Sequence, residues 1–340
     1  MKIAGFDIGG ANTDLAIIEY ENDGEIKNIE TDFSYLPMWY KNDELGETLI
    51  ELIEKICPLN EIDAVGISMT AELVDAYETK KKGVLDIVNK CLKVFNKPIG
   101  FVGVNGMLTP DEIKNKPLEA AAANWIATSE IVASMEKDCI FVDTGSTTTD
   151  IIPIKDGKEC SIGRSDFERL STGELVYTGT LRTNIASFVD KIPLDGSEYR
   201  VASELFAITA DVYNILDLIS PEDYVCDTCD GQGKSKLESM RRISRVLCAD
   251  LEILTEEEIH YICEFIHQAQ VAQIANALDE VAKREKLEIV ITTGLGKDIL
   301  CTEAANSLNL MVKPMSMYLS DEECVVAPAI GTAVMMKNNL

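Results

Sequence analysis

Two short segments of this 340-residue chain carry the same chemistry-bearing pattern. Residues 7–14 read DIGGANTD and residues 143–150 read DTGSTTTD, so both spell DxGxxxTD. Glycine lets backbone amides approach an anion, hydroxyl groups donate further hydrogen bonds, and aspartate holds a divalent cation. Each segment is therefore suited to hold a phosphate group together with a cation.

Each copy supplies its own set of candidate residues. The first aspartate of each copy is the candidate cation ligand and catalytic carboxylate, and the turn residues are candidates for phosphate contacts. The candidates are Asp7, Gly9, Gly10, Asn12 and Thr13 in the first copy and Asp143, Gly145, Ser146, Thr147 and Thr148 in the second. Asp14 and Asp150 are as well suited to brace the turns as to touch ligand. One DxG turn is usually an ordinary hairpin, but the repetition favours an anion-binding cleft.

Apolar runs on both sides of each turn predict that the turns join paired strands. In the first half, the hairpin of residues 2–20 is followed by alternating strands and helices, and the alanine-rich residues 117–135 predict a helix that crosses to the second half. We expect a first domain over residues 1–135 and a similar second domain over residues 136–340.

The second half departs from the first after its hairpin. Residues 164–286 read as a mostly helical insertion, and the alternation resumes at residues 287–296, where a strand runs into the turn TGLG. The sequence thus predicts a duplicated α/β architecture with a helical insertion in the second domain.

The charge of the chain limits its partners. The formal net charge is −27, with 58 acidic and 31 basic residues. Such a charge repels nucleic acid and anionic membranes, so we expect neither as a partner. A phosphate ligand would need local screening by backbone amides, a few lysines or a metal cation.

The ten cysteines are irregularly spaced in a long chain, which favours reduced thiols over a disulfide framework. The N-terminal residues lack a signal-peptide pattern and no apolar run is long enough to span a bilayer, so a cytoplasmic protein is expected.

A CxxC at Cys226 and Cys229, with His260, Cys263 and His267 further on, raises the possibility of zinc. Because no second CxxC exists, reduced surface thiols are the preferred interpretation.

The two DxG hairpins and the later TGLG turn resemble the superfamily of actin, the sugar kinases and the heat-shock chaperones. That resemblance implies two duplicated RNase H-like domains around a central cleft. It also implies that the phosphate loops face each other and that Gly294 and Gly296 line the ligand from the TGLG turn. Lys297 directly follows this turn and is suited to contact a diphosphate oxygen or to stay solvated.

Four further blocks narrow the resemblance. GISMTAELVDAY from residue 66, AANWIATSEIVAS from 122, GELVYTGTLRT from 173 and TTGLGKDI from 292 resemble the hydantoinase/oxoprolinase family, in its archaeal branch of methanofuran biosynthesis. The branch implies a transferase that joins an (aminomethyl)furan-methyl diphosphate to γ-glutamyltyramine, forms an aryl ether and releases pyrophosphate. Small-molecule substrates and Mg²⁺ are then the expected partners and cofactor.

The block around Tyr177, Thr178 and Arg182 is where this resemblance places the acceptor. Arg182 is suited to pair with the glutamyl carboxylate of the acceptor, or to brace the insertion by bonding to backbone. The sequence does not identify a base for the phenol, whose ordinary pKa is about 10.

Two other functions stay open on the sequence alone. One is an ATP-dependent enzyme of the oxoprolinase or kinase kind, in which ATP would replace the diphosphate donor. The other is a nucleotide-binding regulator without turnover. The apolar helices of the insertion would also allow copies of the chain to pair as a homo-oligomer.

Overall fold

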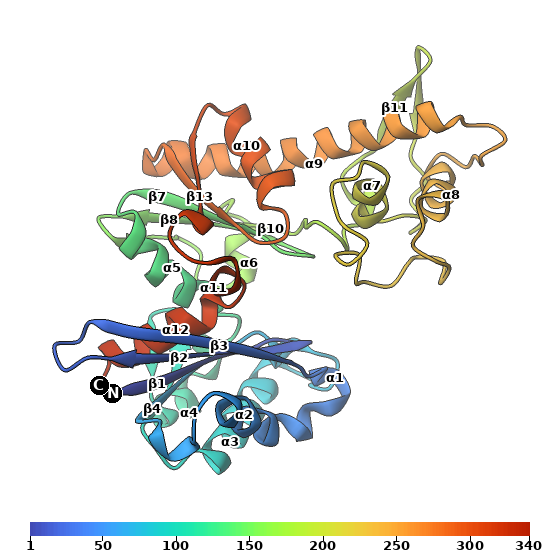
Figure 1. Ribbon diagram of the computed structural model, residues 1–340. Coiled ribbons are helices and arrows are strands. Elements are labelled where there is room, and N and C mark those ends of the chain that lie inside the picture. The colour runs from blue at the N-terminus through green and yellow to red at the C-terminus, as the bar shows by residue number, and fades with distance from the viewer. The chain divides into compact units, whose positions relative to one another are not determined.

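The computed structural model describes all residues from 1 to 340, which form two compact units (Figure 1). The first comprises Met1–Asp138, Ile154–Asp166 and Met315–Leu340, and the second comprises Cys139–Pro153 and Phe167–Pro314. Each unit is built on one mixed β-sheet.

The sheet of the first unit has the strand order β3-β2-β1-β4-β5-β6. Strands β1, β2 and β3 are antiparallel, β4 and β5 run parallel to β1, and β6 closes the edge as an antiparallel strand. The bounds are β1 Lys2–Ile8, β2 Asn12–Tyr20, β3 Ile26–Tyr35, β4 Ala64–Met69, β5 Ile99–Gly103 and β6 Gly106–Leu108. Every residue of β4 is buried, as expected for a parallel strand covered on both faces.

Helices cover this sheet because their apolar residues recur at helical spacing. In α2, Leu45, Leu49 and Leu52 lie on one buried face. The helices of the unit are α1 Met38–Lys41, α2 Leu45–Ile56, α3 Lys80–Val94, α4 Pro110–Asn115, α5 Asn124–Met135, α11 Asp321–Val325 and α12 Ala327–Asn338. The C-terminal helix α12 packs against both β1 and α5.

Glycine makes the contact between α12 and α5 possible. A Cβ atom on Gly331 would lie 1.9 Å from the backbone oxygen of Ala127. Backbone cannot give way as a side chain can, so we expect Gly331→Ala to lower the free energy of unfolding by about 1–3 kcal/mol or more. Thermal unfolding would measure this, with Val334→Ala on the same helix as the control. Equal melting temperatures for the two variants would contradict it.

The sheet of the second unit repeats the order of the first. Its strands follow β10-β8-β7-β13-β14, with β9 paired to the end of β8. Strand β13 runs parallel to both β7 and β14. The bounds are β7 Cys139–Thr144, β8 Thr149–Lys155, β9 Lys158–Glu159, β10 Leu175–Val176, β13 Ile289–Thr293 and β14 Met311–Pro314.

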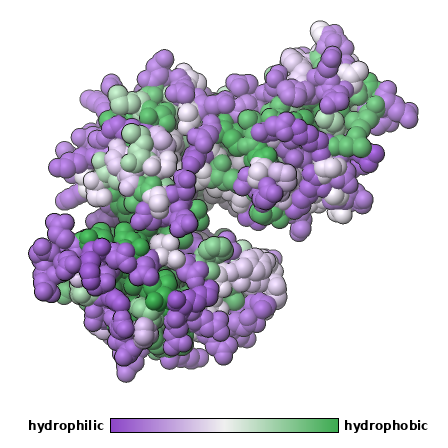
Figure 2. All heavy atoms as spheres, viewed as in Figure 1, coloured by the Kyte–Doolittle hydropathy of each residue, from purple (hydrophilic) through white to green (hydrophobic).

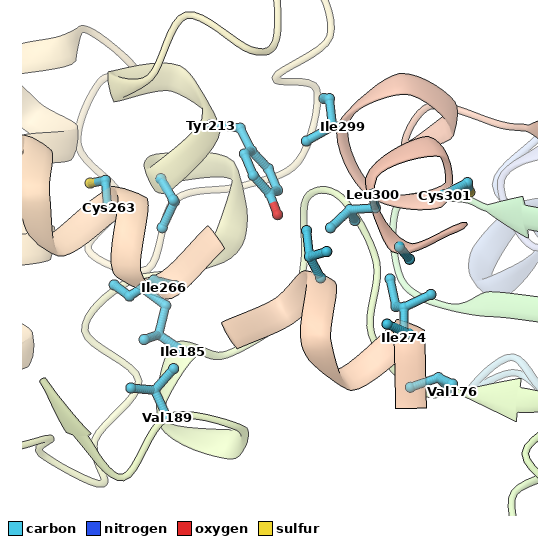
Figure 3. Close-up of a cluster of buried hydrophobic side chains, with 14 of the residues drawn as sticks. Val176, Ile185, Val189, Tyr213, Cys263, Ile266, Ile274, Ile299, Leu300 and Cys301 are labelled. Carbon is cyan, nitrogen blue, oxygen red and sulfur yellow. The ribbon is translucent and has the colours of Figure 1, made fainter. Parts of the chain in front are cut away.

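The rest of the second unit is helical with one added hairpin. Its elements are α6 Asp166–Arg169, which starts at the junction of the units, β11 Lys191–Leu194, β12 Ser197–Arg200, α7 Thr209–Ile215, α8 Lys236–Val246, α9 Glu256–Glu285, a π-helix Lys297–Cys301 and α10 Thr302–Ser307. Helix α9 begins with a capping box between Thr255 and Glu258. Figure 3 shows side chains of α9, such as Ile266 and Ile274, within the buried cluster of this unit.

Two local predictions were wrong. The alanine-rich stretch forms a short 3-10 helix at Pro117–Ala120 and an α-helix only from Asn124, because Ala122 takes a left-handed conformation (φ 49°) that interrupts a helix. The expected mostly helical stretch also contains the hairpin of β11 and β12. All four residues of β12 are exposed, so this strand lacks the alternation of buried residues that marks a strand in a sequence. Hydrophilic residues cover most of the face drawn in Figure 2, as the charge of the chain predicts.

Candidate functional site

The first DxG turn joins β1 to β2 within the first unit. Asp7 and Asp14 are register partners on the two strands, and the amide of Gly9 donates to the carbonyl of Asn12 at 2.8 Å. The amides of Gly10 and Ala11 donate to no acceptor in the chain. Adjacent unpaired amides at a turn form a site for an anion.

Asp7 is the second feature of this turn. The residue is 7% exposed, and its carboxylate accepts from Ser68 Oγ at 2.7 Å and from Asn124 Nδ2 at 3.4 Å. Burial raises the pKa of Asp7, while these two hydrogen bonds lower it in part. Burial and the neighbouring Asp7 raise the pKa of Asp14 to about 7. Two poorly solvated carboxylates without a cationic partner thus stand beside the turn.

The second DxG turn joins β7 to β8 in the second unit and has the same form. The amide of Gly145 donates to the carbonyl of Thr148 at 3.0 Å, and the amides of Ser146 and Thr147 have no acceptor in the chain. Burial, and then Asp150, raise the pKa of Asp143 to about 7. The copies differ at their last aspartate, because Asp150 pairs with the buried Arg169 at 2.6 Å.

A second loop of the same unit lies directly on this turn. The amides of Leu181 and Arg182 both donate to the carbonyl of Ser146, at 3.0 and 2.9 Å. A Cβ atom on Gly179 would lie only 2.4 Å from the backbone nitrogen of Thr147, so only glycine fits there. Gln270 on α9 stabilises this loop, because its side-chain amide donates to Thr178 Oγ1 at 2.8 Å.

The TGLG turn meets the other side of Asp143. Thr293 pairs with Asp143 in the sheet, and the amide of Gly296 donates to the carbonyl of Thr144 at 2.9 Å. Gly294 has φ 86°, and a Cβ atom there would lie 2.3 Å from Asp143 Oδ1. Lys297 starts the π-helix just after the turn. The second unit therefore brings residues 143–148, 178–183 and 294–297 together.

Arg182 points its guanidinium at the turn. Its Nε and Nη2 atoms donate to Thr147 Oγ1 at 3.0 and 2.7 Å, and its side chain is exposed. Neighbouring Tyr177 is 66% exposed, whereas Thr178 is fully buried. Thr13, a candidate in the first unit, is also fully buried.

Sequence reasoning missed the groups that support these loops. Ser68, Asn124 and Gln270 each bond to a site residue that is distant in the chain. Ser68 also accepts from Thr332 Oγ1 on α12 at 3.0 Å. Ser68 and Asn124 lie in two of the blocks that carry the family resemblance, and membership of these blocks was the one sequence signal that could have identified them.

The cysteine and histidine residues do not assemble a metal centre. His267 pairs with Glu303 at 3.0 Å, and the exposed His260 lies 3.5 Å from Glu264. Cys226 and Cys229 are partly buried against the core, and Cys263 is inside it. No group of three or more His, Cys, Asp or Glu side chains in the chain is arranged to hold a metal ion.

None of the helices is long and apolar enough to cross a membrane.

The topology of both units and the solved structures define the class of protein. Component A of the (R)-2-hydroxyglutaryl-CoA dehydratase of Acidaminococcus fermentans has a TM-score of 0.50 at 12% identity, over 99% of this chain and 98% of that one. A nucleotide-free acetone carboxylase has a TM-score of 0.58 at 8% identity, over 98% of this chain and 70% of that one. The chain has the duplicated RNase H-like fold of actin and the sugar kinases, which confirms the predicted class.

The family follows from sequence comparison. Residues 63–339 match the Hydantoinase/oxoprolinase family. A Methanocaldococcus jannaschii protein named (4-{4-[2-(gamma-L-glutamylamino)ethyl]phenoxymethyl}furan-2-yl)methanamine synthase is 44% identical over 100% of this chain and 99% of its own length. A Methanococcus vannielii protein of the same name is 37% identical over 61% of this chain and 94% of its own. The chain belongs to the hydantoinase/oxoprolinase family, as predicted.

Proposed function

We propose that this protein is the methanofuran-pathway transferase that joins an (aminomethyl)furan-methyl diphosphate to γ-glutamyltyramine. The observation that carries the proposal is the 44% identity, over essentially both full lengths, to a synthase named for the aryl ether product. The phenol oxygen forms a bond to the furan methylene carbon, the bond from that carbon to the diphosphate oxygen breaks, and the diphosphate leaves with the electron pair. The phenol proton passes to solvent or to a base, so the reaction needs no oxidant and no ATP.

The two DxG turns supply what such a leaving group requires. We assign diphosphate oxygens to the unpaired amides of the DxG turn in each unit: Gly10 and Ala11 in the first, and Ser146 and Thr147, aided by the Thr148 hydroxyl and the TGLG turn, in the second. Amides fixed in place before the reaction stabilise charge that develops on the leaving oxygen, without the cost of reorienting solvent. They also bind an anion in a chain of net charge −27 without extra basic residues.

The carboxylates of Asp7 and of Asp143 each fit the ligand chemistry of a magnesium ion. Both are hard oxygen ligands, both have a raised pKa because they are poorly solvated, and neither has a cationic partner. Mg²⁺ keeps waters and phosphate oxygens among its ligands, so one or two carboxylates suffice to hold it beside a diphosphate. When bound, Mg²⁺ would neutralise charge on the departing diphosphate.

We further propose that Arg182 binds the diphosphate, rather than the acceptor carboxylate or the backbone of the insertion, which are the two roles that the sequence leaves open. Its two bonds to Thr147 use only part of its five-donor fork, and the remaining donors stay available beside the turn. An arginine on a phosphate-binding turn forms charge-assisted hydrogen bonds that are about twice as strong as neutral ones.

The role of Arg182 predicts a loss of pyrophosphate affinity. A hydrogen bond to a charged group contributes about 1.5–3 kcal/mol, so Arg182→Ala should raise the dissociation constant of Mg-pyrophosphate by about 12-fold to 160-fold. Titration calorimetry measures it, with the exposed Arg200→Ala as control. If pyrophosphate affinity is unchanged and the Michaelis constant for γ-glutamyltyramine rises instead, Arg182 belongs to the acceptor.

The reaction itself is tested by one incubation. Protein, Mg²⁺, the furan diphosphate and γ-glutamyltyramine are combined without ATP, and the ether and pyrophosphate are measured by mass spectrometry. We expect both products in equal amounts. No product without ATP, together with ATP hydrolysis when ATP is added, would replace this function with the ATP-dependent one.

A further inference from the structure

Exposed aromatic side chains gather on one short segment of the first unit. Phe33, Tyr35, Trp39 and Tyr40 are 59%, 65%, 45% and 63% exposed, and all lie within eight residues at the end of β3 and in α1. The other tryptophan of the chain, Trp125, is only 5% exposed. An exposed tryptophan and tyrosine side by side leave a large apolar area in water, which calls for an explanation by binding.

The segment is joined directly to the first DxG turn. The amide of Leu36 donates to the carbonyl of Ala11 and the amide of Met38 donates to the carbonyl of Gly10, both at 2.8 Å. Trp39 is therefore the next residue after one that is bonded to the turn. The turn amides assigned to the diphosphate and the aromatic pair belong to one continuous piece of backbone structure.

The aromatic pair is also held rigidly. Met38 is fully buried on one side of it. On the other side, Lys90 Nζ on α3 donates to Asn42 Oδ1 at 2.6 Å. The rings of Trp39 and Tyr40 contact each other edge to face, with centroids 5.8 Å apart. The segment is thus anchored on both sides of the rings, so little backbone entropy is lost when the rings bind a ligand.

We propose that Trp39 and Tyr40 form a ring-binding subsite that stacks on the furan of the diphosphate donor. This inference rests on the proposed function and extends it from the leaving group to the group that is transferred. The furan is the occupant because a single methylene connects it to the diphosphate, which the adjacent turn binds. The ring of tyrosine or tryptophan offers a π-face to another aromatic ring, and it would favour an aryl over an alkyl donor.

The test compares three ligands that differ only in the group attached to the diphosphate. They are furan-2-ylmethyl diphosphate, a branched alkyl diphosphate of similar size, and Mg-pyrophosphate. Aromatic pairs contribute about 0.5–1.5 kcal/mol, so Trp39→Ala should weaken the furan compound by about twofold to 12-fold. Binding of pyrophosphate and of the alkyl compound should change by less than about twofold. Trp39→Phe, which keeps a ring, should bind the furan compound nearly as well as the wild type.

Tyr199→Ala is the matched control, because Tyr199 has the same 45% exposure as Trp39 and lies on β12 of the other unit. Tryptophan fluorescence gives a second reading, since Trp39 is exposed and Trp125 is buried. The furan compound should quench the fluorescence of the wild type and leave that of Trp39→Phe unchanged.

The outcomes separate this inference from the proposed function. Wild-type protein that binds the furan compound no better than the alkyl one, or equal furan binding by Trp39→Ala, overturns the subsite. A change in the molecular mass of Trp39→Ala in light scattering, with furan affinity retained, would assign the rings to contacts between copies and likewise overturn it. Absence of the ether product overturns the function, whereas the binding preference is measured without turnover.

Discussion

Asp143→Asn should abolish turnover while the protein stays folded. Asparagine has nearly the same size and keeps one oxygen, so the contacts of Gly294 and Gly296 with residues 143–144 remain. It removes the negative charge that we assign to the cation and hence the neutralisation of the leaving diphosphate. Loss of one group that stabilises transition-state charge costs about 10²–10³-fold in kcat, and loss of the cation would add to this.

The same substitution should stabilise the metal-free protein at alkaline pH. The folded-state pKa of Asp143, about 7, is above its ordinary value of 3.8, so between these values the folded protein holds a proton that the unfolded chain has released. The resulting stability is fully present below the ordinary value and is lost as pH rises through about 7. At pH 8 the wild type therefore carries a poorly solvated charge that asparagine lacks.

Melting curves in EDTA and in Mg²⁺ measure both effects. We expect Asp143→Asn to melt above the wild type in EDTA at pH 8, and the difference to shrink towards pH 6. Mg-pyrophosphate should raise the melting temperature of the wild type more than that of the variant, because ligands stabilise the state that binds them. Asp156→Asn, at an exposed turn of the first unit, is the control. Near-normal turnover by Asp143→Asn would place the catalytic cleft elsewhere.

The sequence alone could predict the parts of the site that depend on local pattern. The DxGxxxTD repeat predicted both hairpins, because turn chemistry and flanking apolar runs are written in consecutive residues. It could not predict that Asp150 is neutralised by Arg169 whereas Asp14 has no cation. The two copies read alike, and the difference comes from a residue outside the repeat.

Long-range contacts explain the other misses. Ser68, at the end of β4, and Asn124, at the start of α5, both donate to Asp7. Their spacing along the chain does not predict these contacts. The left-handed Ala122 opposes the helix propensity of the alanines around it, so local propensity predicted the wrong start for α5.

Gly179→Ala should lower turnover by about 100-fold, through the position of the second turn. The added Cβ would lie 2.4 Å from the backbone nitrogen of Thr147 and 2.6 Å from the carbonyl carbon of Ser146. Backbone contacts this short force one loop to move by about 1 Å, and such a displacement near reacting groups costs about 100-fold in rate. Because Arg182 donates to the Thr147 hydroxyl, the turn amides and the guanidinium would move together.

A displaced turn lowers kcat and pyrophosphate affinity in the folded protein, whereas a loss of stability alone lowers only the melting temperature. Gly196 has φ 75° and no atom within 4 Å of an added Cβ, so Gly196→Ala strains the backbone without moving a neighbour. We expect Gly196→Ala to melt at a lower temperature with unchanged kcat and pyrophosphate affinity. Gly179→Ala should lose both kcat and pyrophosphate affinity at temperatures where circular dichroism shows it folded. If Gly179→Ala is folded and keeps wild-type pyrophosphate affinity, the loop of residues 178–183 does not determine the position of the second DxG turn. The diphosphate would then be bound by other groups.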